Sequence, residues 1–459
     1  MRDSDSPLES QPGPGRLVAL VALAFVAGAA TGLLGAAFRA SLDGADRFRN
    51  ALIASQRAEP ITGFLVVVGV CAAATLIAAW LVRRFSRYAS GSGIPHVEAV
   101  LRGLLPPAPY GLAPIKFAGG VLAIGAGLAL GREGPSVQMG ASIANFVGCT
   151  FRLAWADRRT LCAAAAGAGL ATAFNAPIAG AAFVLEELVQ RFEIRVTMAA
   201  LAASAAAIGV SRALLGDAPD LDLAALPTVG AKALPLFCLL GAGSALIAVA
   251  YNRTLLATLA VVERVPLPVE ARAGFIGAAV GALSWFCPGL VGGGDALTQN
   301  ALSGSPRLEI VALIFLLRFG LGAISYAAAT PGGLFAPLLV LGAQSGLLFG
   351  GACRWAFPTL EVPIESFALV GMAAFFTGVV RAPLTGIVLA SEMTGNVNLF
   401  NPMLGACAIA MLVPALLRNA PIYDSMRDDL LRHERRRATA AIGGEAVVAD
   451  APPQATPAP

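Results

Sequence analysis

The feature that most constrains this chain is a series of long apolar runs without a single charged residue. Residues 17–38, 61–82 and 393–417 are three such runs. A helix of about 20 apolar residues crosses the hydrocarbon core of a bilayer, so each run is long enough to span it. Only 13% of the 459 residues are charged, whereas soluble domains carry about 25%. The sequence therefore predicts an all-α, polytopic membrane protein that lies in a lipid bilayer.

Charge, cysteine and histidine content exclude several classes of function. The formal net charge is +4, and its excess falls mostly in the tail between Arg427 and Arg437, as expected for a cytoplasmic segment. No nucleic-acid partner is indicated. The seven cysteines stand singly in or beside apolar runs, and the only histidines are His96 and His433. We therefore expect no disulfide framework, no metal site and no cofactor.

Composition divides the chain into four parts. They are a disordered N-terminal tail (1–15), a first transmembrane half (16–215), a second transmembrane half (216–425) and a basic, then Ala/Pro-rich, cytoplasmic tail (426–459). Acidic residues near the start argue against a cleaved signal peptide. In the first half we expect a spanning helix from Leu17, a polar loop over 43–59 and a second helix from Ile61. Residues 438–459 are expected to be disordered.

Glycine and proline interrupt the apolar segments that follow. The interruptions fall at 91–95, at 131–135 and at 175–177, and the segments between them include stretches too short to span a bilayer. Short hydrophobic segments broken in this way are typical of discontinuous helices that line a binding site near the middle of the membrane.

The second half of the chain repeats three features of the first. Residues 91–93 match 292–294 at an offset of 201, and Gly134-Pro135 has a counterpart within 333–337. Nine residues separate Pro177 from Glu186, and nine separate Pro383 from Glu392. Three matches in order at a nearly constant offset predict an internal duplication, and the repeated halves of transporters are commonly inverted.

The stretch 131–135, Gly-Arg-Glu-Gly-Pro, indicates a site for an anion. A proline is tolerated in the first turn of a helix, so a helix can begin close to Pro135. The free N–H groups of that helix start and the positive end of its dipole attract anions. Glu133 places a protonatable carboxyl group at the same point. We interpret the stretch as an anion site that the protein's own side chain can occupy, with a second helix start near Pro337.

Taken together, these motifs resemble the CLC family of chloride channels and proton/chloride antiporters. The similarity covers about residues 16–425. It is carried by GSGIP (91–95), FNAPIAG (174–180), GREGP (131–135), GLFAP (333–337), RAPLTG (381–386) and the late Tyr423. The resemblance implies a CLC-like fold with two repeated, inverted halves and broken helices. It also implies a homodimer with one complete anion path in each subunit.

The resemblance assigns a chloride site to four residues. The hydroxyl groups of Ser92 and Tyr423 would hold a central chloride, helped by the backbone N–H groups of Leu334 and Phe335. Partial charges suit this task because a full positive charge would bind the ion too tightly to release it. Taken alone, Ser92 would be interpreted as a helix N-cap and Tyr423 as a residue of the membrane interface.

The resemblance also assigns the proton path. Glu133 would be the external gate, which competes with chloride for the helix N-termini, and Glu187 would be the internal proton acceptor of the exchangers. Arg132 and Gly134 would support the gate. Structural roles are expected for the other charged residues of the apolar half-helices, namely Glu186, Glu392, Lys116 and Arg318. His96 is expected on a helix surface.

The leading hypothesis is a secondary active transporter that exchanges chloride for protons, and the alternative is a passive chloride channel of the same fold. Glu187 separates the two, because a channel needs no internal proton acceptor. Fluoride export is disfavoured because this chain keeps both GREGP and GSGIP. Asp295 and Asp424 superficially resemble the aspartates of an intramembrane protease, but they stand in reversed order, so we do not expect an enzyme. The short tails fit a bacterial inner membrane.

Overall fold

The computed structural model describes residues 14–303, 307–359 and 361–449. The N-terminal tail up to residue 13 and the last ten residues therefore lie outside the described residues. Within the described part, the chain is almost entirely helical and contains no strand longer than an isolated bridge. The predicted all-α fold is confirmed.

The first half begins with two long helices and continues with shorter, broken ones. Its elements are α1 (Pro14–Gln56), α2 (Pro60–Phe85), the 3₁₀ turn η1 (Arg87–Ala89), α3 (Ile94–Leu101), α4 (Leu112–Gly125), α5 (Glu133–Thr150), α6 (Trp155–Phe174), α7 (Pro177–Phe183), the π-helical turn η2 (Val184–Leu188) and α8 (Ile194–Leu215). The breaks after α2, after α4 and between α6 and α7 coincide with the glycine and proline interruptions.

The second half repeats this order. Its elements are η3 (Ala231–Ala233), α9 (Leu234–Glu263), α10 (Val269–Phe286), η4 (Pro288–Leu290), α11 (Asp295–Leu302), α12 (Leu308–Tyr326), α13 (Phe335–Ala356), α14 (Ile364–Val380), α15 (Pro383–Thr394), α16 (Phe400–Leu416) and the C-terminal α17 (Ile422–Ala449). The short helices α3 and α11 both have eight residues, and each follows a glycine with positive φ, Gly93 (85°) and Gly294 (99°). Only glycine adopts such a conformation at little cost.

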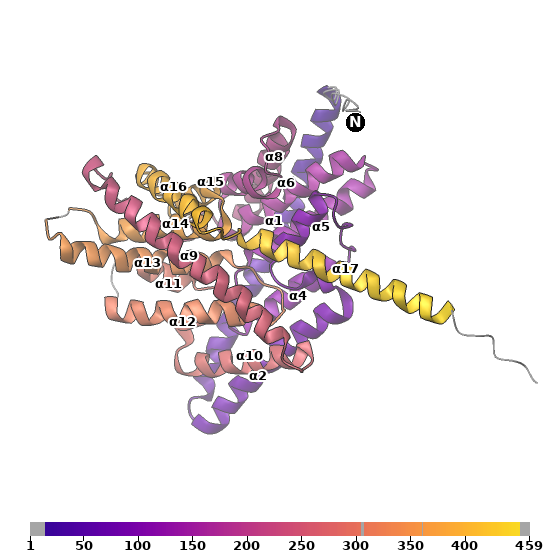
Figure 1. The fold of residues 1–459 in the computed structure, drawn as a ribbon, viewed down its shortest axis with the longest axis horizontal. Coiled ribbons are helices and arrows are strands. Elements are labelled where there is room, and N and C mark those ends of the chain that lie inside the picture. Colours follow the sequence, from indigo (N-terminus) through magenta and orange to yellow (C-terminus); the bar gives the residue numbers. More distant parts are fainter. Residues whose placement is uncertain (1–13, 304–306, 360, 450–459) are drawn as a thin grey trace, which may run out of the picture.

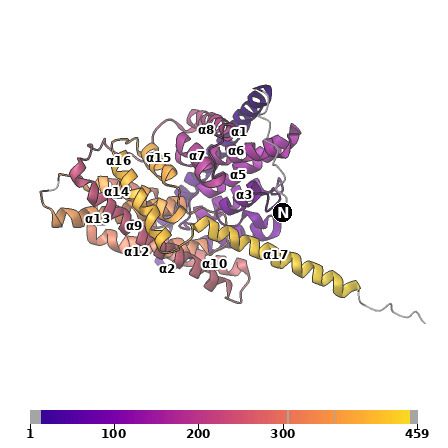
Figure 2. The ribbon, with the colours of Figure 1, turned by 45° about the horizontal axis from the view of Figure 1, so that its top comes forward.

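The two halves lie side by side, and their central helices pack against one another (Figure 1). Helix α2 of the first half packs along α10 of the second, and α7 packs against α15. Helix α17 begins at the centre of the molecule and projects beyond the bundle in two views (Figure 2). The centre of the molecule is therefore built by the broken helices of both halves together with the start of α17.

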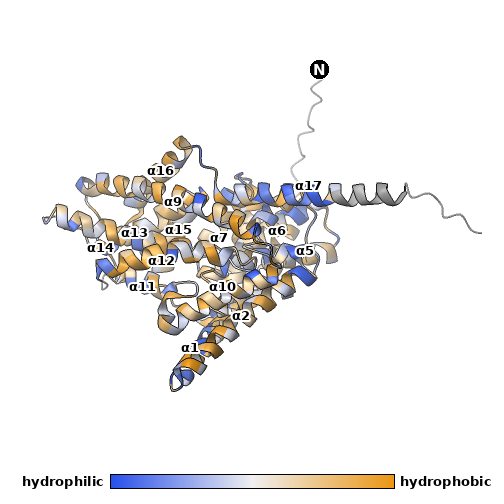
Figure 3. Ribbon diagram, turned by 60° about the horizontal axis from the view of Figure 1, so that its bottom comes forward, coloured by the Kyte–Doolittle hydropathy of each residue, from blue (hydrophilic) through white to orange (hydrophobic). Residues whose placement is uncertain are grey.

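The outer surface fits a lipid environment. Six helical segments of the described residues are long and apolar enough to cross a membrane, namely Gly15–Gln56, Pro60–Phe85, Ile194–Leu215, Ala231–Glu263, Leu308–Tyr326 and Phe335–Ala356. Many large apolar side chains lie on the surface of the helices, and Ile61 on α2 is one of the most exposed. Figure 3 shows hydrophobic colouring over most helices and hydrophilic residues along α17. The chain is a multi-pass membrane protein, as predicted.

The polar loop predicted over residues 43–59 is wrong, because α1 continues without a break to Gln56. Two contacts stabilise this extension. Arg49 pairs with Asp46 one turn earlier at 2.7 Å and donates a hydrogen bond to the carbonyl oxygen of Gly125 at 3.0 Å. Leu42 and Ile53 are buried on the same extension. The charged residues therefore pair along and beside the helix instead of ending it.

The disorder predicted from residue 438 onward is also wrong as far as residue 449. The backbone of α17 stays helical to Ala449. Before residue 438, ion pairs one turn apart stabilise the helix, as between Arg432 and Asp429 at 3.0 Å and between Arg437 and Glu434 at 3.0 Å. Alanine, which is frequent beyond this point, has the highest intrinsic helix propensity. Helix formation therefore continues past the charged segment.

Candidate functional site

Backbone hydrogen bonds join the three Gly/Pro motifs at the centre of the molecule. The N–H of Gly131 donates to the carbonyl of Gly333 at 2.9 Å, and the N–H of Gly333 donates back to that of Gly131 at 2.7 Å. The N–H of Gly91 donates to the carbonyl of Thr330 at 3.0 Å, and Gly332 donates to Gly91 at 3.1 Å. The starts of α3, α5 and α13 are thus fixed beside one another.

The carboxyl group of Glu133 occupies the N-terminus of α13. Glu133 is fully buried, and its Oε1 accepts a hydrogen bond from the backbone N–H of Phe335 at 2.6 Å. The backbone N–H groups of Ala336 and of Glu133 itself also face the carboxylate. Its Oε2 has no hydrogen-bond partner among the described residues. A carboxylate therefore sits where the helix dipole and free N–H groups favour an anion.

Two glycines make this close approach possible. A Cβ atom on Gly333 would collide with Oε1 of Glu133, and a Cβ atom on Gly134 would collide with Oγ of Ser92. The predicted supporting role of Gly134 is therefore steric in this structure: its missing side chain lets α5 begin directly against Ser92.

Ser92 and Tyr423 bring two hydroxyl groups to the same point. Both residues are completely buried, and their hydroxyls lie close enough to interact. Neither hydroxyl has a well-formed hydrogen bond to any residue that the structure describes. The Tyr423 ring also lies against that of Phe335, with centroids 5.9 Å apart. Buried hydroxyl groups normally have hydrogen-bond partners. Two neighbouring buried hydroxyls without such partners are therefore a candidate site for a ligand. Gly93, and not Ser92, is the N-cap of α3.

A second tyrosine belongs to this site and was not predicted. The Tyr326 hydroxyl accepts a hydrogen bond from the backbone N–H of Ser92 at 3.1 Å and lies 3.5 Å from the sulfur of Met426. Tyr326 also lines a cavity of about 330 Å³ with Gly91, Gly93 and Met426. Arg87, Arg272 and His433 line other parts of the same cavity. This cavity provides an approach to the centre from the side of α17.

Two cationic side chains near the site, Arg132 and Lys116, bind backbone carbonyl groups. Arg132 donates to the carbonyl of Ala173 at 2.7 Å and pairs with Asp220 at 2.9 Å. Lys116 is fully buried, and its Nζ donates to the carbonyl oxygens of Ala89 at 3.0 Å and Gly91 at 2.7 Å. Lys116 therefore fixes the loop before α3, and Arg132 ties the start of α5 to the end of α6 and to the segment that contains Asp220.

Glu187 lies on the π-helical turn η2 and is buried, with 5% of its surface exposed. The π-turn follows α7 directly, and such turns are frequent at functional sites because they re-aim side chains. Glu187 is therefore enclosed by protein. Its carboxyl group lies near that of Glu98 on α3.

Glu186 and Glu392 each cap a helix of the opposite half. Glu186 accepts hydrogen bonds from the backbone N–H groups of Leu384 at 2.9 Å and Thr385 at 2.7 Å, at the start of α15. Glu392 accepts them from Ile178 at 3.1 Å and Ala179 at 2.8 Å, at the start of α7. Carboxylates at helix N-termini are stabilising, in agreement with the structural role predicted for both residues.

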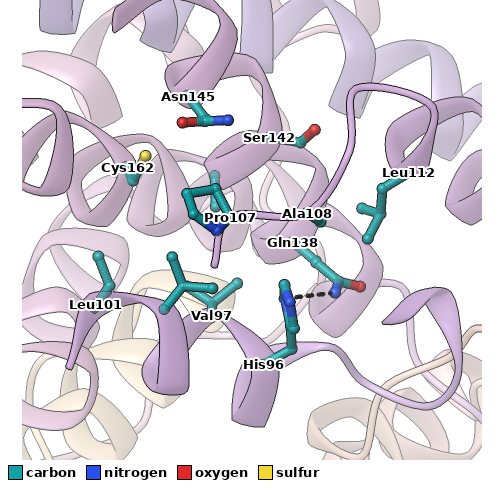
Figure 4. Close-up of a pocket in the computed structure, with 12 residues that line it drawn as sticks. His96, Val97, Leu101, Pro107, Ala108, Leu112, Gln138, Ser142, Asn145 and Cys162 are labelled. Atoms are coloured by element: carbon teal, nitrogen blue, oxygen red, sulfur yellow. Dashed lines mark hydrogen bonds between the residues drawn. The ribbon is translucent and has the colours of Figure 1, made fainter. Parts of the chain in front are cut away.

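His96 was predicted on a helix surface, but it is buried between α3 and α5. Its Nδ1 lies 3.3 Å from Nε2 of Gln138, and its ring stacks on that of Tyr88 with centroids 4.4 Å apart. Figure 4 shows His96 and Gln138 beside a small cavity, which Asn145 and Cys162 also line. The volume of this cavity is about 30 Å³. The short helix α3 is buried over its whole length, which its periodicity does not reveal.

Comparison with known proteins agrees with this architecture. The family model described as voltage gated chloride channel matches residues 74–415, about three quarters of the chain. Fold and site together define a class of membrane protein in which broken helices meet at a buried candidate site for an anion. The chain belongs to the CLC family of chloride channels and transporters.

Individual relatives cover nearly the whole chain. The H(+)/Cl(-) exchange transporter ClcA of Vibrio parahaemolyticus is 34% identical over 425 residues, which are 90% of this chain and 90% of that protein. The crystal structure of a slow cyanobacterial Cl⁻/H⁺ antiporter superposes with a TM-score of 0.87 at 32% identity, covering 90% of this chain and 98% of that one. A CLC-type fluoride/proton antiporter shares the fold, with a TM-score of 0.74 at 23% identity.

Proposed function

We propose that this chain is a secondary active transporter that exchanges chloride for protons across a membrane. The observation that carries the proposal is the Glu133 carboxylate bound at the N-terminus of α13, beside the unpaired hydroxyls of Ser92 and Tyr423. The names of the relatives that match nearly the whole chain support exchange over passive conduction.

In this proposal, chloride is held without a cationic side chain. The hydroxyls of Ser92 and Tyr423 donate to the ion, and the N–H groups of Leu334 and Phe335 replace part of its hydration shell. Arg132 does not enter the site, because its guanidinium is already engaged by Ala173 and Asp220. Dipoles and hydroxyls bind a monovalent anion firmly enough to select it and weakly enough to release it.

Glu133 couples the two substrates because it and chloride compete for the same N–H groups. As an ion, its carboxylate fills the start of α13 as seen here. Once protonated, it loses the charge that the dipole favours and yields the position to chloride. Each turnover therefore links one change in the protonation of Glu133 to the passage of anions, with Glu187 handling protons on the α17 side.

The alternative, a passive chloride channel, is less well supported. A channel has no use for a second buried carboxyl group, yet Glu187 is buried on an irregular turn. The fluoride antiporter at 23% identity shares only the fold, and this chain keeps both GREGP and GSGIP. The aspartates of the protease hypothesis are each paired with an arginine, Asp295 with Arg132 and Asp424 with Arg427.

The setting of the transporter completes the proposal. We place it in a bacterial inner membrane, as a homodimer with one complete anion path in each subunit. The bacterial source of the ClcA relative supports the inner-membrane location. Exposed apolar side chains on α8 and α16, such as Leu201 and Leu412, offer surface for lipid or for a second copy.

The test is a flux assay on purified protein in liposomes that follows chloride and protons together. The wild type is expected to use a chloride gradient to move protons uphill. Glu133→Ala removes the competitor, so chloride should still pass while proton coupling vanishes. A wild type that passes chloride without any proton movement would replace the exchanger by the channel.

A further inference from the structure

A buried cluster of charged residues joins α3, η2 and the first turns of α17. Glu98 and Arg427 are 1% and 7% exposed, and their side chains form an ion pair at 2.9 Å. Arg427 also pairs with Asp424 on its own helix at 2.5 Å. The Arg427 guanidinium therefore links a carboxylate deep in the molecule to a carboxylate near its surface.

The inner carboxylate of this cluster lies near Glu187. The side chains of Glu98 and Glu187 face each other, and α3 packs against both η2 and α17. Two neighbouring carboxylates that are both buried repel each other when both are ionised, so such a pair retains one shared proton. Oε1 of Glu98 meets no hydrogen-bond donor within the described part of the chain, so it is available for that proton.

The outer carboxylate reaches water. The Asp424 side chain is 33% exposed, and Arg102 of α3 lies 4.0 Å from it with 34% exposure. The other charged groups at the cluster are Asp428, paired with Arg427 at 3.5 Å and 61% exposed, and Glu186, which caps α15. Glu187 and Glu98 are thus both buried, at 5% and 1% exposure, and Asp424 is a member of the cluster that opens to solvent.

We propose that Glu98 carries protons between Glu187 and the solvent on the α17 side, and that Arg427 is the positioning residue that holds Glu98 in place for this transfer. The inference deepens the proposed exchange function and rests on it. The step is a proton transfer only: the proton leaves the carboxylic acid of Glu98 for the carboxylate of Glu187. The Glu98 carboxylate then takes a proton from a hydronium ion in the solvent near Asp424, which leaves water.

The charge of Arg427 has a second effect on the transfer. A guanidinium at 2.9 Å favours the ionised form of Glu98, so it helps Glu98 release its proton to Glu187. Without this charge, Glu98 would keep its proton to higher pH. If the ion pair served the fold alone, a change of charge at position 427 would not shift the pH dependence of proton transport.

The test uses the full chain in liposomes with chloride and proton fluxes recorded side by side. Glu98→Gln should lower the proton flux by about tenfold or more, while the chloride flux stays within about twofold of the wild type. Arg427→Gln should move the midpoint of the proton flux against α17-side pH to higher pH, and Arg427→Lys should restore it. Asp157→Asn, which breaks the buried contact of Asp157 with Arg195, is the matched control and should keep the ratio of the two fluxes.

The outcomes separate this inference from the exchange function. If Glu187→Gln abolishes proton flux but Glu98→Gln does not change it, the inference is wrong and the exchanger stands. If the wild type moves no protons, the exchange function itself fails. If Glu98→Gln does not fold, the Arg427→Gln profile decides, and an unshifted midpoint overturns the proposal.

Discussion

The two halves of the molecule carry the same supports but different chemistry. In the first half, Lys116 binds the carbonyl oxygens of the loop before α3. In the second half, Arg318, 202 residues later, binds those of Leu290, Gly292 and Gly293 before α11, at 3.2, 2.8 and 3.0 Å. The exchanged caps of Glu186 and Glu392 follow the same rule. Both halves therefore need a buried cation and a capping acid to hold their broken helices.

The positions assigned to transport do not follow this symmetry. At the offset of 201 residues, Gly293 stands where the first half has Ser92, and at 202 residues Phe335 stands in place of Glu133. Glu187 is matched by Met393 next to Glu392. The first half contributes the carboxyl groups of Glu133 and Glu187 and the Ser92 hydroxyl, whereas the second contributes backbone N–H groups and the hydroxyls of Tyr326 and Tyr423. Duplication thus accounts for the arrangement of the broken helices and their supports. The residues assigned to transport differ between the two halves.

The largest effect is expected at Glu187, and Glu392 of the second half serves as the comparison. Glu187→Gln should reduce proton flux by about a hundredfold because it removes a group that gains and loses protons, with chloride flux retained. Glu392→Gln makes the same chemical change at a capping acid and should leave the flux ratio unaltered. For each variant, chloride and proton electrodes record the two fluxes from the same liposome preparation. Intact proton transport in Glu187→Gln would remove Glu187 from the path.

A smaller effect is expected for the two buried cations. Lys116→Met and Arg318→Met each leave buried carbonyl oxygens without a donor, which costs about 2 kcal/mol of stability. Thermal unfolding in detergent should show a similar loss for both variants. The number of chlorides moved per proton should not change in the molecules that remain folded. A loss confined to one variant would mean that the supports are not equivalent.

The central site was predictable because its motifs act locally. Gly-Pro interruptions mark where helices begin, and Glu133, Ser92 and the 333–337 stretch all belong to such starts. Their meeting at one point follows from the repeat and the family resemblance together. The same reasoning placed Lys116, Glu186 and Glu392 in structural roles, since ionisable groups inside apolar segments must be paired.

The missed residues depend on contacts between distant segments. Tyr326 lies 234 residues from Ser92, and Arg427 lies 329 residues from Glu98. No spacing in the sequence relates either pair, because each contact joins segments that only the folded structure brings together. His96 was misplaced for a related reason: α3 is enclosed on every side, so no polar face marks its surface. The extension of α1 was missed because one partner of Arg49, the carbonyl of Gly125, lies 76 residues away in the sequence.

The most direct test of the central claim is to locate an anion where the Glu133 carboxylate now sits. Crystals of Glu133→Gln grown with bromide should show an anomalous peak within hydrogen-bonding distance of the backbone nitrogen of Phe335, and wild-type crystals should not show it there. Bromide confined to other positions in Glu133→Gln, with the start of α13 empty, would contradict the claim that this carboxylate and the transported anion compete for one site.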